Sequence, residues 1–352
     1  MLKRKGIAVI LIMALLFAFT GCGNSGDDGG AQTEGEVYKV ALARNLPESD
    51  PASQGDLYLK KLLEEKSGGR FEVTWYGNSQ VVANDTEALE KVADGTIQIT
   101  STTAATLASY ASMPVFNVFN EPMMFTSEEE LWTLAESDYM KDYYAQFQEK
   151  TGVILSPNGF SMGWYGYGTA KKDITDINNL KGLKIRVANV PQMIALTEAL
   201  KAAPTSINWN EIFTTLQQGA VDGILCTAGL TYNNSFHEVL SCFKDAKAFA
   251  CYHAFIINEK WYNSLPDDLK TIFDECVAEA TQTYRSNLKT SEEGAVKAMS
   301  DDGVNCSELT DEEHAMLEEM AIEIWKDEAK AAVDKDVINS ALDIIGKSDL
   351  KF

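Results

Sequence analysis

The most informative segment of the chain reads Asn179-Leu180-Lys181-Gly182-Leu183-Lys184-Ile185-Arg186-Val187-Ala188-Asn189-Val190-Pro191. Apolar and polar residues alternate from Leu183 to Ala188, which predicts a strand whose successive side chains point to opposite faces. Arg186 leaves this strand near its C-terminal end, and Pro191 predicts that a helix begins at Asn189. Ligands of open α/β sheets bind at the carboxyl ends of strands, and helix N-termini favour anions. Arg186 is therefore either a clamp for a carboxylate, held by two parallel hydrogen bonds, or an arginine at the surface end of a strand.

The sequence on both sides of this segment alternates between strand and helix patterns. The predicted strands cover residues 37–43, 71–76, 97–100 and 221–225, and the predicted helices cover residues 85–93, 193–202 and 212–218. This alternation is typical of an α/β fold with a mainly parallel sheet. A last helix, predicted from Pro266 to about Ser300, would be roughly 50 Å long at 1.5 Å per residue. Because that length exceeds one small domain, we expect this helix to cross two.

Composition limits the classes of protein that remain. The 352 residues allow roughly two domains, and 45% hydrophobic residues suffice for a full core. The formal net charge of −22 opposes binding to nucleic acids, whose phosphates carry the same sign. The three histidines follow no metal-binding spacing and no C-x-x-C pair occurs, so we expect no metal site. Five cysteines follow Cys22, and whether any of them pair is left open.

The N-terminal segment predicts secretion and a lipid anchor. Three basic residues, Lys3 to Lys5, precede thirteen apolar residues from Ile7 to Phe19. This run is shorter than the roughly 18 residues that span a bilayer, but it suits a signal peptide. Thr20-Gly21-Cys22 resembles a bacterial lipobox, in which Cys22 would be acylated, whereas a plain secretory signal is the alternative. We therefore expect an extracytoplasmic protein held to the cell membrane by lipid alone.

One motif points to a different class of protein. Gly159-Phe160-Ser161-Met162-Gly163 matches the G-x-S-x-G nucleophile elbow of α/β-hydrolases. That elbow needs a strand before the serine and a helix directly after it. Residues 153–155 could form the strand, but the two glycines among the aromatic residues 164–168 disfavour a helix. A secreted serine esterase that uses Ser161 is thus an alternative to a simple glycine-rich connection beside a strand.

Two motifs together resemble a known family. Leu180 to Val187, followed by Trp209-Asn210-Glu211-Ile212-Phe213-Thr214-Thr215-Leu216-Gln217-Gln218-Gly219-Ala220-Val221-Asp222-Gly223, is similar to the signature of DctP-type solute-binding proteins of TRAP (tripartite ATP-independent periplasmic) transporters. The resemblance runs from about Val37 to the C-terminus. It implies two α/β domains with a ligand cleft between them, of the periplasmic-binding-protein type, bridged by the long helix. The expected division is a signal peptide (1–21), a tether (22–35), domain I (36–163 plus about 252–290) and domain II (164–251 plus about 291–352).

The resemblance also implies a function and a set of site residues. Arg186 occupies the position of the arginine that clamps the substrate carboxylate, and the pocket positions fall on Asn45, Asp85, Thr103, Asn189 and Trp209. Such a protein has no catalytic residue and no cofactor. It is expected to capture an organic acid as a monomer and deliver it to the membrane subunits of a TRAP transporter. A ligand-binding lipoprotein for an ABC importer or a sensor kinase is the alternative within the same class.

The chain departs from the family pattern at two places. Many dicarboxylate and acidic-sugar binders carry a second arginine upstream, where this chain has Tyr165-Gly166-Tyr167. Where such members have an asparagine after the Asp-Gly pair, this chain has Cys226. We expect Tyr165, Tyr167 and Cys226 to line the pocket and to favour a monocarboxylate with an apolar or aromatic body over a sugar acid.

Overall fold

The computed structural model describes residues 35–352, so the predictions on the signal segment and on Cys22 lie outside the described residues. Three strands make up the first half of the sheet: β1 (Tyr38–Ala43), β2 (Phe71–Tyr76) and β3 (Ile99–Thr103). β1 pairs in parallel with both β2 and β3. The predicted strand at 71–76 and helix at 85–93 are confirmed at these bounds, and β3 begins two residues later than predicted.

The second half of the sheet surrounds the strand that carries Arg186. Its strands are β5 (Lys184–Val187), β6 (Ala203–Ser206), β7 (Gly223–Thr227), β8 (Cys242–Asp245) and β10 (Asn305–Glu308). β5 lies between β6 and β7 and is parallel to both. Each half is therefore a parallel unit of the kind that the alternating pattern predicts.

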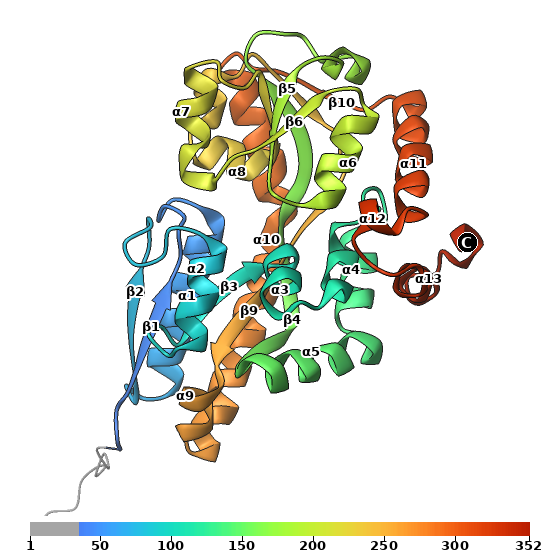
Figure 1. Cartoon of the computed structure of the whole chain (residues 1–352). Coiled ribbons are helices and arrows are strands. Elements are labelled where there is room, and N and C mark those ends of the chain that lie inside the picture. The colour runs from blue at the N-terminus through green and yellow to red at the C-terminus, as the bar shows by residue number, and fades with distance from the viewer. Residues whose placement is uncertain (1–34) are drawn as a thin grey trace, which may run out of the picture. The chain divides into compact units, whose positions relative to one another are not determined.

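Two long strands and one long helix connect the halves (Figure 1). β4 (Val153–Thr169) first pairs antiparallel with β9 (Ala250–Asn258) and then with β7 and β8. Its pairing with β9 is interrupted by irregularities at Leu155/Gly159 and at Ser161/Trp164. Helix α10 (Asp267–Asp301) packs beside β4 and contacts α1 and α8, which confirms the long helix expected from the sequence.

Helices cover both faces of the sheet. Along β1, Val40 and Leu42 enter one apolar core while Ala43 enters the other, as expected for parallel strands buried on both faces. The remaining helices are α1 (Pro51–Lys66), α2 (Asp85–Ala93), α3 (Ala104–Ala111), α4 (Glu128–Ala135), α5 (Asp138–Thr151), α6 (Pro191–Ala199), α7 (Ile212–Gln217), α8 (Ala228–Asn233), α9 (Glu259–Ser264), α11 (Asp311–Trp325), α12 (Glu328–Ala331) and α13 (Lys335–Ile344).

The C-terminal segment touches both halves of the molecule. α11 contacts α6, whereas α13 contacts α4 and the 3-10 helix η1 (Pro114–Asn120). The domain boundaries given above stay a prediction. Within residues 35–352, no helix has both the length and the apolar character needed to cross a bilayer.

Candidate ligand-binding cleft

The carboxyl ends of strands from both halves open into one cleft of about 1500 Å³. Arg44 and Asn45 follow β1, and Thr103 ends β3, on the side of the first half. Arg186 on β5 and Asn189 before α6 line the side of the second half. The cleft therefore lies where open α/β sheets bind their ligands, at the edge that the sequence indicated.

Arg186 is a buried cation without an acidic partner among the described residues. Its side chain is 6% exposed, and its Nε and Nη2 atoms donate to the carbonyl oxygen of Ile207 at 3.1 and 2.9 Å. The guanidinium carbon lies 5.9 Å from the centre of a Trp209 ring. Burial lowers the pKa of Arg186, and no carboxylate of residues 35–352 forms an ion pair with it. The guanidinium is held in place by a neutral acceptor, and no acidic side chain of residues 35–352 pairs with its charge.

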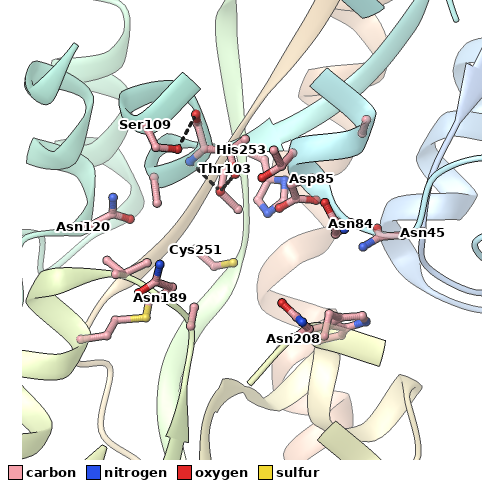
Figure 2. A pocket seen from close by; sticks show the side chains of 18 of the residues that line it. Asn45, Asn84, Asp85, Thr103, Ser109, Asn120, Asn189, Asn208, Cys251 and His253 are labelled. Carbon is pink, nitrogen blue, oxygen red and sulfur yellow. Dashed lines mark hydrogen bonds between the residues drawn. The ribbon is translucent and has the colours of Figure 1, made fainter. Parts of the chain in front are cut away.

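Six of the other expected pocket residues line the same cleft as Arg186. They are Asn45, Asp85, Thr103, Tyr165, Asn189 and Trp209. Figure 2 shows Asp85 and Thr103 together in the upper part of the pocket and Asn189 in the lower part. The hydroxyl oxygen of Tyr165, on β4, accepts a hydrogen bond from the Cys251 thiol at 3.5 Å.

Two of the expected pocket residues do not line the cleft. Tyr167 lies two residues beyond Tyr165 on β4, pairs with Leu225 and is fully buried in the apolar core. Cys226 on β7 is 1% exposed and packs in the other core; burial raises its pKa to about 11, with Arg186 opposing the increase. The structure places neither residue at the cleft, because both side chains lie in the apolar cores. Of the departures from the family pattern, Tyr165 alone is among the described residues that line the cleft.

The sequence reasoning missed several side chains of the cleft. Arg44 directly follows β1, the same strand-end position that drew attention to Arg186, so a signal for it was present. His253 on β9 is 7% exposed and lies 3.5 Å from the hydroxyl of Ser101. Burial and the charge of Arg44 lower the pKa of His253 to about 3, so the ring is neutral at pH 7. The others include Asn84, Asn120, Asn208 and Cys251.

Ser161 is not part of a nucleophile elbow. β4 continues as a strand on both sides of it, and no helix follows. The hydroxyl donates to the carbonyl oxygen of Gly163 and accepts from the Gly163 amide, both at 3.1 Å, and the side chain is buried. Gly163 has a positive φ of 98° and lies at the irregularity between Ser161 and Trp164. The motif therefore allows the strand to depart from regular pairing at this point. This geometry does not support the esterase alternative.

Disulfides and metal-binding clusters are both missing from the part of the chain that the structure describes. All five cysteines among the described residues are free thiols, and four of them are buried. Residues 35–352 contain no cluster of three or more histidine, cysteine or acidic side chains that could hold a metal ion. The arrangement can thus bind a ligand by charge, hydrogen bonds and aromatic contact.

Comparison with known proteins agrees with this geometry. Residues 42–331 match the family model DctP, described as bacterial extracellular solute-binding protein, family 7. The C4-dicarboxylate-binding periplasmic protein DctP of Rhodobacter capsulatus is 28% identical over 290 residues, which cover 81% of this chain and 84% of that protein.

Solved structures of the same kind share the fold. The sugar acid binding protein DctPAm of Advenella mimigardefordensis, in complex with galactonate, superposes with a TM-score of 0.82 at 21% identity over 89% of this chain and 99% of that chain. A TRAP periplasmic solute-binding protein of Shewanella oneidensis with bound succinate has a TM-score of 0.80 at 20% identity over 88% and 99%. These likenesses confirm the α/β fold predicted from the sequence, with two domains around a cleft.

Proposed function

Because the chain belongs to the bacterial extracellular solute-binding proteins of family 7, the DctP family, we propose that it captures an organic acid through Arg186 and delivers it to the membrane subunits of a TRAP-type secondary transporter. The location outside the cytoplasm follows from the family. The observation that carries the ligand class is the buried guanidinium of Arg186, which lines the cleft and has no acidic partner among residues 35–352.

The chemistry of Arg186 favours a carboxylate over other ligands. A carboxylate that enters the cleft loses its hydration, and a fixed cation compensates for that loss. The planar guanidinium matches both carboxylate oxygens and stays charged even where burial lowers its pKa. The contact with the carbonyl oxygen of Ile207 orients the side chain before the ligand arrives, which reduces the entropy cost of binding.

The bound ligands of relatives support the same class. The relatives described above bind a C4-dicarboxylate, galactonate and succinate, all of them organic acids. An ABC importer or a sensor kinase could use the same captured ligand, and uptake by membranes that contain TRAP subunits would separate these partners. Acylation of Cys22 would hold the protein, as a monomer, at the membrane surface, and Cys22→Ser would then release it.

Titration calorimetry tests the role of Arg186. A thermal-shift screen of organic acids first finds a ligand, since saturation at 100 times Kd stabilises the protein by about 2.7 kcal/mol. Arg186→Ala should then weaken binding by about 2–5 kcal/mol, the cost of removing one partner of a buried charge pair. Arg186→Lys should recover only part of this loss, because one ammonium cannot form the bidentate contact.

A matched arginine outside the cleft provides the control. Arg70 forms an ion pair with Asp268 on the surface and does not line the cleft. Arg70→Ala should leave the affinity unchanged. Equal affinity of Arg186→Ala and the wild type would remove Arg186 from the site, and with it the carboxylate ligand.

A further inference from the structure

The charged side chains that line the cleft are unevenly matched. Arg44 is neutralised by Asp56, its bidentate partner, which leaves Arg186 as the lining cation without an ionic partner among residues 35–352. Asp85 is the corresponding anion: it lines the cleft and has no hydrogen bond or ion pair within the same residues. Glu90 and Glu211 line the cleft as well, but both lie exposed, and Glu87, which also lines it, forms an ion pair with Lys91.

Asp85 and Arg186 lie on different halves of the molecule, and each acts on a different member of one hydrogen-bonded pair. Asp85 is the first residue of α2, and Arg186 lies on β5. Burial raises the pKa of Cys251 and the charge of Asp85 contributes to it, while burial raises the pKa of Tyr165 and the charge of Arg186 opposes it. Cys251 and Tyr165 are hydrogen-bonded to each other, so Asp85 and Arg186 act on the two members of a single hydrogen-bonded pair.

Asp85 stays available as an acceptor at neutral pH. Burial raises the pKa of Asp85 to about 6 against the opposing charge of Arg44, which still leaves most of the carboxyl ionised at pH 7. The N-terminus of α2 favours the negative form as well. Figure 2 shows Asp85 pointing into the pocket beside His253, whose neutral ring supplies no compensating charge.

A second carboxylate on the ligand would therefore meet a carboxylate of the protein. Like charges brought together in a buried site oppose binding, whereas a hydroxyl or an ammonium group could donate to the unpartnered oxygens of Asp85. We propose that the cleft selects a monocarboxylate that carries a hydrogen-bond donor, a hydroxyl or an ammonium group, at the end that faces Asp85, and that it discriminates against dicarboxylates of the same length. This inference rests on the proposed function, since it requires Arg186 to hold the first carboxylate.

Length-matched ligands test the inference by titration calorimetry. The aliphatic set is butyrate, 4-hydroxybutyrate, 4-aminobutyrate and succinate; the aromatic set is phenylacetate, 4-hydroxyphenylacetate and 4-carboxyphenylacetate. In the set that binds, a donor-bearing member should bind at least about tenfold more tightly than both the unsubstituted acid and the dicarboxylate. The inference is overturned if the donor-bearing members bind no more tightly than the unsubstituted acid or no more tightly than the dicarboxylate.

Variants assign the selectivity to Asp85. Asp85→Asn, which has nearly the same shape, should reduce the discrimination against the dicarboxylate to below about threefold. It should retain an acceptor for a hydroxyl but lose the attraction for an ammonium group, so the two donors are distinguished. Asp94→Asn removes one negative charge at the exposed C-terminal end of the same helix, outside the lining of the cleft, and should leave the ratio unchanged.

The outcomes separate this inference from the proposed function. Dicarboxylate binding that equals or exceeds that of the donor-bearing acids, and that Arg186→Ala abolishes, overturns the inference and leaves the proposed function intact. An unchanged ratio in Asp85→Asn also overturns it. If no acid of either set binds, both fail. The wild-type ratios decide the matter even if the variant does not fold.

Discussion

Arg44 and Arg186 border the same cleft and are buried to nearly the same degree, with exposures of 4% and 6%. Arg44 donates from Nε and Nη2 to the two oxygens of Asp56, at 2.5 and 2.7 Å, and Asp56 is itself fully buried. Arg186 donates the same two groups to one backbone carbonyl. Burial lowers the pKa of both, but for Arg44 the charge and hydrogen bond of Asp56, together with Tyr284 and Asp50, outweigh burial and raise the pKa, whereas that of Arg186 stays lowered.

The difference separates a structural arginine from one that is available to a ligand. The pair of Arg44 and Asp56 joins the end of β1 to α1, and Asp56 offsets the charge that Arg44 brings to the cleft. The guanidinium of Arg186 is buried, and no acidic side chain of residues 35–352 balances its charge. Burying such a charge costs free energy, and a bound anion would reduce that cost. Burial alone does not distinguish the two; the presence of an acidic partner does. The following predictions test that distinction.

Arg44→Ala should give the largest effect, a loss of about 3–5 kcal/mol in the free energy of unfolding without ligand. The substitution leaves the carboxylate of Asp56 buried without its partner. Denaturant unfolding of the wild type, Arg44→Ala, Asp56→Ala and the double variant measures the coupling between the two. The double variant should be more stable than the sum of the single losses implies. Additive losses would show that the pair is not coupled.

Much of this fold could be predicted from the sequence, because its signals are local. The strand at 71–76 alternates and stops at Gly77, and α2 is capped by Asn84 and ends before Asp94-Gly95. β4 could not be predicted at its full length. Pro157 and several glycines weaken its strand pattern, and its partner β9 is about ninety residues away in the sequence.

Some residues of the site could likewise be predicted from the sequence, and others could not. Arg186 could be placed at a strand end because the alternation and the following Pro191 mark that end. The pairing of Arg44 with Asp56 depends on how α1 is rotated against the sheet, which no local pattern records. Tyr167 was expected in the cleft but lies in the apolar core. The sequence of β4 does not show where the strand passes from the cleft into the core, because that depends on contacts with residues far away in the chain.

Glu292 extends the comparison to a partly buried acid that has no cationic partner among residues 35–352. It accepts a hydrogen bond from the amide of Gly229 at 2.8 Å, and burial raises its pKa to about 8. A raised carboxyl pKa means that the folded state binds more protons than the unfolded state between about pH 4.5 and 8. The free energy of unfolding should therefore fall as the pH rises through this window, by up to about 2 kcal/mol between pH 6.5 and 8.

Glu292→Gln should remove this pH dependence. His253, with its pKa of about 3, acts in the opposite direction, but only below its ordinary pKa of 6.5, which is why the window starts there. Glu293→Gln changes the same charge at the adjacent exposed residue and serves as the control. Denaturant midpoints at several pH values measure the effect. Parallel profiles for the wild type and Glu292→Gln would show that Glu292 has no shifted pKa.

The smallest effect is expected where the comparison is most direct, in the unliganded stability of Arg186→Met. Removing the guanidinium gives up two hydrogen bonds and leaves the carbonyl of Ile207 without them. It also relieves the cost of an unpaired buried charge, and Met can pack beside Trp209. Because these contributions oppose one another, the free energy of unfolding should change by less than about 1 kcal/mol. At a ligand concentration of 100 times Kd the free energies of unfolding of the two proteins should differ, since ligand binding adds roughly 2.7 kcal/mol to the wild type alone. A loss above about 3 kcal/mol without ligand would make Arg186 a structural arginine like Arg44, and its lack of an acidic partner would then say nothing about a ligand.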